Sequence, residues 1–161
     1  MLSKRKGFTL IELLIVSVII LALVSFSTPL FRKTFTDLEL KEAVSNISKL
    51  MGLAQQRAII ERYRYRLLFD FEGRQYRLSR IEGEGQNIKA LKDSFGRPFK
   101  IPQSVDVKGN TKEIVFYPDG SCGSPGAERD VIELELTNKN ENTMTISVIE
   151  ATGNVVITQK K

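Results

Sequence analysis

The chain has 161 residues, with 24 Lys and Arg against 19 Asp and Glu and a formal net charge of +5. It has one cysteine, no histidine and no tryptophan. It therefore cannot form an internal disulfide, a Cys/His zinc site or a Ser-His-Asp triad. We expect no enzyme activity, no metal site and no cofactor.

The first predicted element is an apolar segment from Phe8 to Phe31, in which Glu12 is the only charged residue. As a helix, this segment would span roughly 36 Å, against about 30 Å for the hydrocarbon core of a bilayer. The basic cluster Lys4, Arg5 and Lys6 directly precedes it and favours an N-terminus on the inner side. We therefore predict a membrane-spanning helix over residues 8–31.

Three simpler interpretations compete with a specialised role for this segment. It could be an ordinary signal anchor, a buried core helix, or a cleavable signal peptide with its site at Ser25-Phe26-Ser27. Glu12 argues against all three, because an acid costs about 2.5–3.5 kcal/mol at the centre of a membrane helix. Cleavage after Gly7 would create a cationic amine at Phe8, and a neighbouring subunit's Glu12 could neutralise it.

The N-terminal residues resemble the processing motif of prepilins, in which basic residues, Gly, Phe and Glu follow in this order. The matching run is Lys4-Arg5-Lys6-Gly7-Phe8-Thr9-Leu10-Ile11-Glu12-Leu13-Leu14. The resemblance implies that prepilin peptidase removes the leader, residues 1–7, by cutting between Gly7 and Phe8 and then methylates the Phe8 amine. It also implies that Glu12 acts in assembly and that Pro29 kinks the helix.

An amphipathic helix is predicted over residues 32–60, where apolar residues recur every three or four positions. Its apolar stripe contains Leu40, Ala43, Val44, Ile47, Leu50, Met51, Ala54 and Ala58. We expect this stripe to face the protein's own core.

A β-hairpin is predicted after Ile60, because the apolar period changes from about 3.6 to two. A two-residue type II′ turn at Gly73-Arg74 would connect its strands. The expected register pairs Phe71 with Tyr76, Phe69 with Leu78 and Asp70 with Arg77. In this register Tyr63 and Tyr65 face the core, while Arg64, Arg66 and Arg77 face outward.

The remainder is predicted to be antiparallel β structure, so the chain as a whole is α+β. We expect a loop over residues 82–97, and strands near 99–107, 113–118, 131–137, 143–149 and 154–158. The antiparallel β domain would therefore occupy residues 61–161.

The C-terminal half is similar to the GspH/FimT group, which contains minor pseudopilins of type II secretion and minor pilins of type IV pili. The matching segments are Phe116-Tyr117-Pro118-Asp119-Gly120-Ser121, Asp130-Val131-Ile132-Glu133-Leu134, Ile146-Ser147-Val148 and Thr152-Gly153-Asn154-Val155-Val156-Ile157. Taken singly, Asp119, Gly120 and Gly153 are also ordinary turn residues.

Two other features of the sequence are weaker candidates for sites. Cys122 lies in a predicted loop and is interpreted as an incidental thiol, while Asp93, Asp119 and Asp130 lack the spacing of a calcium loop. Seven arginines from Arg57 to Arg80 suggest nucleic-acid binding, but the predicted register places Arg64, Arg66 and Arg77 on the face opposite Tyr63 and Tyr65. We expect no more than weak DNA binding.

These features together predict a structural subunit. It would be a single-pass inner-membrane protein with a periplasmic C-terminal domain, and it would join a filament after processing. Its partners would be prepilin peptidase, the inner membrane, and other pilin or pseudopilin subunits bound through the N-terminal helix. The favoured function is a GspH-like pseudopilus subunit of type II secretion. The alternative is a FimT-like minor pilin in pilus biogenesis or DNA uptake.

Overall fold

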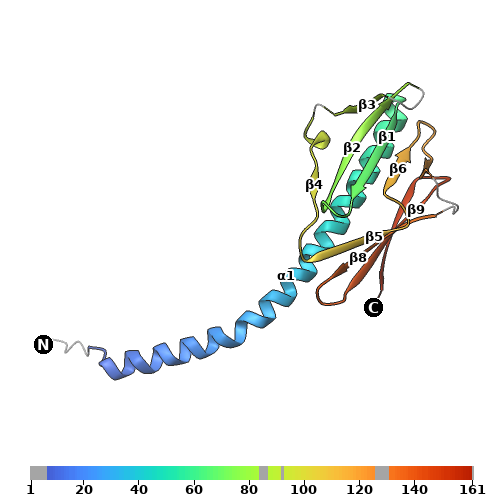
Figure 1. The fold of residues 1–161 in the computed structure, drawn as a ribbon. Helices are drawn as coiled ribbons and strands as arrows, with labels where there is room; N and C mark the ends of the chain where they lie inside the picture. The colour runs from blue at the N-terminus through green and yellow to red at the C-terminus, as the bar shows by residue number, and fades with distance from the viewer. Residues whose placement is uncertain (1–6, 84–86, 92, 126–130, 161) are drawn as a thin grey trace, which may run out of the picture. The chain divides into compact units, whose positions relative to one another are not determined.

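The computed structural model describes residues 7–83, 87–91, 93–125 and 131–160, with the side chains of 26–32 and 160 left out (Figure 1). The chain divides into two compact units, Met1–Phe35 and Thr36–Lys161. One helix, α1 (Leu10–Glu61), begins in the first unit and ends in the second. The second unit contains all of the strands.

The second unit is built from two antiparallel sheets. The six-stranded sheet has the order β3-β2-β1-β6-β7, with β4 paired to β2. Its strands are β1 (Arg64–Asp70), β2 (Gln75–Glu82), β3 (Asn87–Ala90), β4 (Phe99–Lys100), β6 (Glu113–Phe116) and β7 (Cys122–Gly123). The four-stranded sheet has the order β10-β9-β8-β5. Its strands are β5 (Val105–Gly109), β8 (Val131–Asn138), β9 (Thr143–Ile149) and β10 (Asn154–Lys160).

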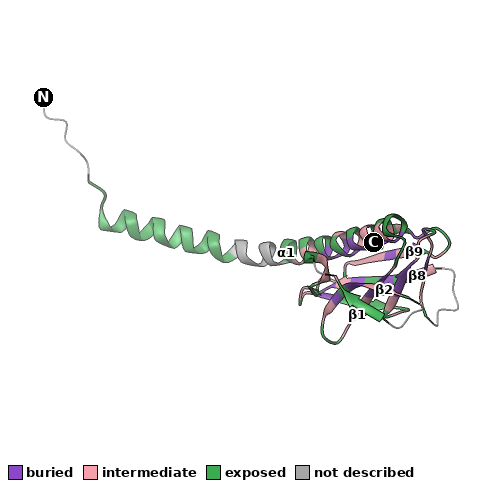
Figure 2. Ribbon diagram, turned by 90° about the horizontal axis from the view of Figure 1, so that it is seen from above, coloured by how far each residue is buried: buried purple, intermediate pink, exposed green. Residues whose placement is uncertain are grey.

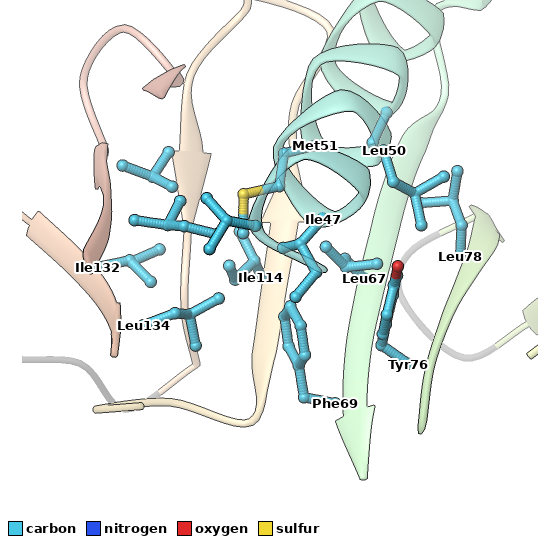
Figure 3. Close-up of a cluster of buried hydrophobic side chains, with 14 of the residues drawn as sticks. Ile47, Leu50, Met51, Leu67, Phe69, Tyr76, Leu78, Ile114, Ile132 and Leu134 are labelled. Carbon is cyan, nitrogen blue, oxygen red and sulfur yellow. The ribbon is translucent and has the colours of Figure 1, made fainter. Parts of the chain in front are cut away.

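The core of this unit lies between α1 and the two sheets. All eight residues of the predicted apolar stripe on α1 are buried, with exposed fractions of 6% or less. Figure 3 shows Ile47 and Met51 between Leu67 and Phe69 of one sheet and Ile132 of the other. Burying each such side chain contributes about 1.5–3 kcal/mol relative to leaving it in water. The buried face runs along the second half of α1 (Figure 2), and the expectation of an α+β fold is confirmed.

The predicted register of the first hairpin is wrong by two residues. Asp70 lies opposite Gln75 and Phe69 opposite Tyr76. The expected pairs of Phe71 with Tyr76, Phe69 with Leu78 and Asp70 with Arg77 do not form. Because side chains alternate with a period of two, a two-residue slip leaves the same residues facing the core.

The turn explains the slip, because Asp70 closes a four-residue loop over residues 71–74. Its carboxylate accepts hydrogen bonds from the backbone N–H of Gly73 at 2.8 Å and from the side chain of Gln75 at 3.1 Å. These bonds hold the pKa of Asp70 below its usual value. Arg74, and not Gly73, adopts the left-handed conformation, with a φ of 51°. Gly73 is needed for space, because a Cβ there would lie 2.1 Å from the Asp70 carboxylate.

The predicted loop over residues 82–97 contains regular structure, so that expectation is corrected. The strand β3 pairs with β2, with Ile88 opposite Ile81. A short 3-10 helix, η1 (Ser94–Gly96), follows, and the Asp93 carboxylate caps it by accepting from the Phe95 N–H at 3.0 Å. Residues 84–86 and 92 lie outside the described part of the chain.

The later strands follow the predicted order with two differences. The strand predicted near 99–107 is two strands, β4 and β5, with Pro102 between them. Proline lacks the N–H that a sheet ladder needs, which accounts for the interruption. The short strand β7 falls in a segment that the sequence predicts to be a loop.

Candidate functional site

The N-terminus of α1 is closed by a reciprocal pair, Thr9 and Glu12. The Glu12 backbone N–H donates to Thr9 Oγ1 at 3.3 Å, and the Thr9 backbone N–H donates to Glu12 Oε2 at 3.1 Å. The Thr9 hydroxyl also donates to Glu12 Oε2 at 3.1 Å. This is a capping box, which satisfies N–H groups that the first helical turn leaves without partners. Glu12 therefore has a local role at the helix start.

Gly7 and Phe8 are open to their surroundings. The Phe8 side chain is 80% exposed, and a Cβ built on Gly7 would meet no described atom within 4 Å. The folded chain therefore has no steric need for glycine at position 7. A requirement for glycine there would have to come from a second molecule that contacts this backbone.

The first part of α1 is apolar on all sides and exposed on all sides. The large apolar residues from Leu10 to Val24 are between 47% and 85% exposed. The hydroxyls of Ser17 and Ser25 donate to the carbonyl oxygens of Leu13 at 2.7 Å and Leu21 at 2.8 Å, so neither requires water as an acceptor. A helix that is hydrophobic all round is normally buried in protein or lipid.

Within the described residues, no stretch of helix meets the length and hydropathy criteria for crossing a membrane. The helix assignment continues through Pro29, whose side chain lies outside the described set, and the kink at Pro29 stays a prediction. The leader residues 1–6 also lie outside the described residues.

Two turns from the segments that resemble the GspH/FimT group contact the same helix residue, Gln55. Its side-chain amide donates to the carbonyl oxygens of Gly120 and Thr152, at 2.7 Å each. Gly120 and Gly153 have positive φ values of 90° and 63°. A Cβ on Gly153 would lie 2.4 Å from the Gln55 amide nitrogen. The Pro-Asp-Gly and Thr-Gly turns are therefore joined through α1.

Cys122 lies in β7 and is buried, in contrast to the predicted loop position. Its thiol is within 3.8 Å of the Ile149 carbonyl oxygen, and its backbone N–H donates to the Glu150 carbonyl oxygen at 2.8 Å. Burial raises the pKa of the thiol to about 11, so little reactive thiolate exists at neutral pH. The interpretation of Cys122 as an incidental thiol is consistent with this position.

The arginines between Arg57 and Arg80 are mostly engaged in contacts within the protein. Their partners are Asp93 for Arg57, the Gly83 carbonyl for Arg64, Glu113 for Arg66, Asp106 for Arg74, and Glu61 and Glu82 for Arg80. These contacts compete with phosphate for the same guanidinium groups.

The predicted placement of the two tyrosines is half right. Tyr65 is fully buried, and its hydroxyl donates to Glu61 at 2.6 Å. Tyr63 is 42% exposed, and the Arg80 guanidinium lies 4.6 Å from its ring centroid. The expectation that Tyr63 faces the core is wrong, because β1 begins only at Arg64 and the alternation does not extend before it.

A cluster of amides that the sequence analysis missed holds α1 near the start of the second unit. The Asp37 carboxylate accepts hydrogen bonds from the side chains of Asn138 at 2.6 Å, Asn142 at 2.8 Å and Asn140 at 3.1 Å. All three asparagines belong to the β8–β9 connection or its edge. Because these contacts bridge about a hundred residues, the local sequence carries no signal for them. The capping role of Thr9, by contrast, has a local signal in the sequence, because Thr-x-x-Glu before an apolar run is typical of a capping box.

Comparisons with known proteins bear on both the N-terminal motif and the fold. The family described as the prokaryotic N-terminal methylation motif matches residues 2–28. The minor pseudopilin EpsH from the type 2 secretion system of Vibrio cholerae has a similar structure, with a TM-score of 0.60 and 12% identity over 75% of this chain and 97% of that chain. A second crystal structure of EpsH gives a TM-score of 0.59 and 11% identity over 79% of this chain and 98% of that chain.

The type IV minor pilin FimU of Pseudomonas aeruginosa is also similar, with a TM-score of 0.56 and 14% identity. That likeness covers 79% of this chain and 92% of FimU. The fold is pilin-like. The chain carries the N-terminal methylation motif, and the similar structures fit the resemblance to the GspH/FimT group. No curated protein matches the chain in sequence.

Proposed function

We propose that the chain is a minor pilin-like structural subunit of a periplasmic pseudopilus in type II secretion. Prepilin peptidase cuts it between Gly7 and Phe8 and methylates the new amine at Phe8. Residues 8–31 hold the subunit in the inner membrane before assembly and form part of the filament core afterwards. The second unit lies in the periplasm.

The observation that carries this proposal is the exposed apolar surface of α1 directly after a capped motif. The large apolar residues between Leu10 and Val24 are at least 47% exposed in the isolated chain. Lipid covers this surface before assembly, and the helices of neighbouring subunits cover it in the filament. A soluble monomer would have no reason to retain so much exposed apolar surface.

Glu12 has two partners in this mechanism. In the isolated chain its carboxylate accepts two hydrogen bonds from Thr9. During assembly a neighbour's Phe8 amine neutralises the same carboxylate, since a cation beside a carboxylate in a low-dielectric core is strongly favoured over either group alone. Glu12 also lies in the first turn of α1, near the positive end of the helix dipole, where a negative charge is stabilising.

We prefer a pseudopilus to a type IV pilus with a role in DNA uptake on one structural ground, the contacts of the arginines. EpsH and FimU are similar to the chain at 12% and 14% identity, and these values support the fold alone. The engagement of the arginines between Arg57 and Arg80 within the protein speaks against the DNA-uptake role of the alternative.

The test is mass spectrometry of the N-terminal peptide from a sheared filament fraction. The proposal expects a methylated peptide that begins at Phe8. A peptide that begins at Met1, or after Ser27, contradicts it. Deletion of the gene then separates the two machines: loss of exoprotein secretion supports the pseudopilus, while loss of surface pili or transformation with normal secretion supports the FimT-like alternative.

A further inference from the structure

The strand β10 forms an edge of the four-stranded sheet. It pairs with β9 without interruption from Asn154 to Lys160, and no described strand lies on its other side. Folded proteins usually protect such edges with proline, a bulge, short length or charge. β10 has seven residues, no proline and no charged residue before Lys160 at its end. Its neighbouring apolar residues Val156 and Ile157 are 43% and 45% exposed.

An open groove of about 410 Å³ runs beside this edge, between α1 and the four-stranded sheet. Its lining residues are Lys41, Val44, Ser45, Ser48 and Lys49 of α1, Met144 of β9, and Val155 and Ile157 of β10. Val44, Met144, Val155 and Ile157 give the groove an apolar part, and Ser45 and Ser48 contribute small side chains to it. Val156 is absent from this lining, because successive residues of a strand point to opposite faces.

The hydrogen bonds of Asp37 and Gln55, two residues of α1 that are 18 positions apart, fix the direction of β10 along the groove. Asp37 contacts Asn142, directly before β9, and Gln55 contacts Thr152, two residues before β10. β9 therefore runs in the same direction as this part of α1, and β10 runs in the opposite direction. A strand added antiparallel to β10 would run along α1 in the same direction as the helix.

The charges of the groove are of one sign. Among the described side chains, Lys41 and Lys49 are the charged residues that line it, and they lie eight residues apart on the helix. At 1.5 Å per residue this separation is about 12 Å. In a strand, residues i and i+4 on one face are about 13 Å apart. Acids at these two positions would meet both lysines, with residue i+2 over the apolar part near Ile157.

We propose that β10 and this groove bind an extended segment of another protein subunit, which adds as a strand antiparallel to β10. Its groove-facing residues follow the pattern acid, apolar, acid at positions i, i+2 and i+4. Backbone pairing supplies affinity, and the alternate side chains supply specificity. The surface lies entirely in the second unit, so the proposal does not depend on the N-terminal motif. A second copy of β10 is a poor occupant, because its Val155, Ile157 and Gln159 carry no acid for the lysines.

The probe is a fluorescent seven-residue peptide in which Glu, Val and Glu alternate with four threonines. It is titrated against the full chain in detergent, beside a peptide with Lys in place of both Glu. We expect the acidic peptide to bind and its affinity to fall with added salt. The double variant Lys41→Glu with Lys49→Glu should bind the acidic peptide about tenfold more weakly and should bind the lysine peptide instead.

A matched pair of variants tests the groove itself. Ile157→Glu places a charge in the groove and should weaken the acidic peptide at least about tenfold. Val156→Glu adds the same charge to the next residue, with nearly the same exposure but on the opposite face, and should leave binding unchanged. No binding by the acidic peptide, equal binding of both peptides, or equal losses in the two variants would overturn the proposal. Self-association through β10 that excludes the peptide would also overturn it.

Discussion

The side-chain amide of Gln55 donates to the carbonyl oxygen of Gly120 at 2.7 Å and thereby joins α1 to the Pro-Asp-Gly turn. The same amide nitrogen donates to Thr152. The two turns that resemble the GspH/FimT group are therefore one structural feature. Its integrity depends on Gly153, which lies against Gln55.

Substitution of Gly153 should destabilise the second unit. In Gly153→Ala, the new Cβ lies 2.6 Å from the Gly120 carbonyl oxygen, and a φ of 63° is strained for alanine. We expect the free energy of unfolding to fall by about 2 kcal/mol. Gly52→Ala is the control, because that site is in the α1 interior with open space around it, and it should gain about 1 kcal/mol. Urea unfolding of both variants measures the difference; equal effects would contradict the account.

Gly7→Leu should block processing without affecting folding. A Cβ at position 7 would have no described atom within 4 Å, so the chain itself tolerates a larger residue. The peptidase must accommodate that side chain beside the bond it cuts. We expect uncleaved precursor in the membrane fraction on an immunoblot, with an unfolding transition equal to the wild type. Normal cleavage of Gly7→Leu would show that the enzyme has no requirement for glycine here.

Glu12→Val should insert in the membrane and fail to enter filaments. The substitution makes the apolar segment more hydrophobic and removes the carboxylate that we propose pairs with a neighbouring subunit's Phe8 amine. Crosslinking of the sheared fraction should detect a steep loss of incorporation. Thr9→Ala is the matched control, because it removes the capping hydroxyl and costs about 1 kcal/mol of helix stability while keeping the carboxylate. If Thr9→Ala fails equally, the cap and not the charge pair is what assembly needs.

The second unit should lose stability at high pH. Burial raises the pKa of Cys122 to about 11 and that of Tyr76 to about 12, so both groups stay neutral in the folded chain after their unfolded forms ionise. The unfolded state then binds fewer protons, and stability falls from about pH 9 to about pH 12. Thermal unfolding across this range measures the loss. Tyr76→Phe should make the decline less steep, and an unchanged slope would count against the tyrosine contribution.

DNA binding should be weak and independent of sequence, with a dissociation constant of about 10⁻⁴ to 10⁻⁶ M at physiological salt. Arg66 lies 3.5 Å from Glu113, and Arg64 donates to the Gly83 carbonyl. Tyr65 is buried, so its ring is not available to stack on a nucleobase. Titration of the full chain in detergent with duplex DNA, at several salt concentrations, measures this. Submicromolar binding that disappears when Arg64 and Arg66 become alanine would favour the DNA-uptake alternative.

The sequence predicts those features of the fold that depend on periodic burial. The stripe from Leu40 to Ala58 is buried as expected, because a helix on a core leaves one face out of water. The hairpin shows the limit of this reasoning. Alternation assigns Phe69 and Leu78 to the core, but it cannot distinguish registers that differ by two residues. Side-chain capping of the turn by Asp70 decides between them.

In the candidate site, too, the local features could be predicted from the sequence and the long-range contacts could not. The Gly7-to-Glu12 motif is local, so its residue order can be read directly, and the capping partner Thr9 lies only three residues from Glu12. The contacts of Gln55 and Asp37 join residues that are 65 to 105 positions apart. Each depends on the final arrangement of helix and turns, and polar residues in turns are too common for the sequence to identify such partners.

The Asp37 cluster has a mechanical consequence for the proposed function, in which the subunit would be held by its helix. Tension along α1 reaches the second unit at its first residues, Thr36 and Asp37, before it reaches the hydrophobic stripe. There the carboxylate is held by amides of Asn138, Asn140 and Asn142 on the β8–β9 connection. A pull on the helix would therefore load these three hydrogen bonds and, through them, the connection between two paired strands.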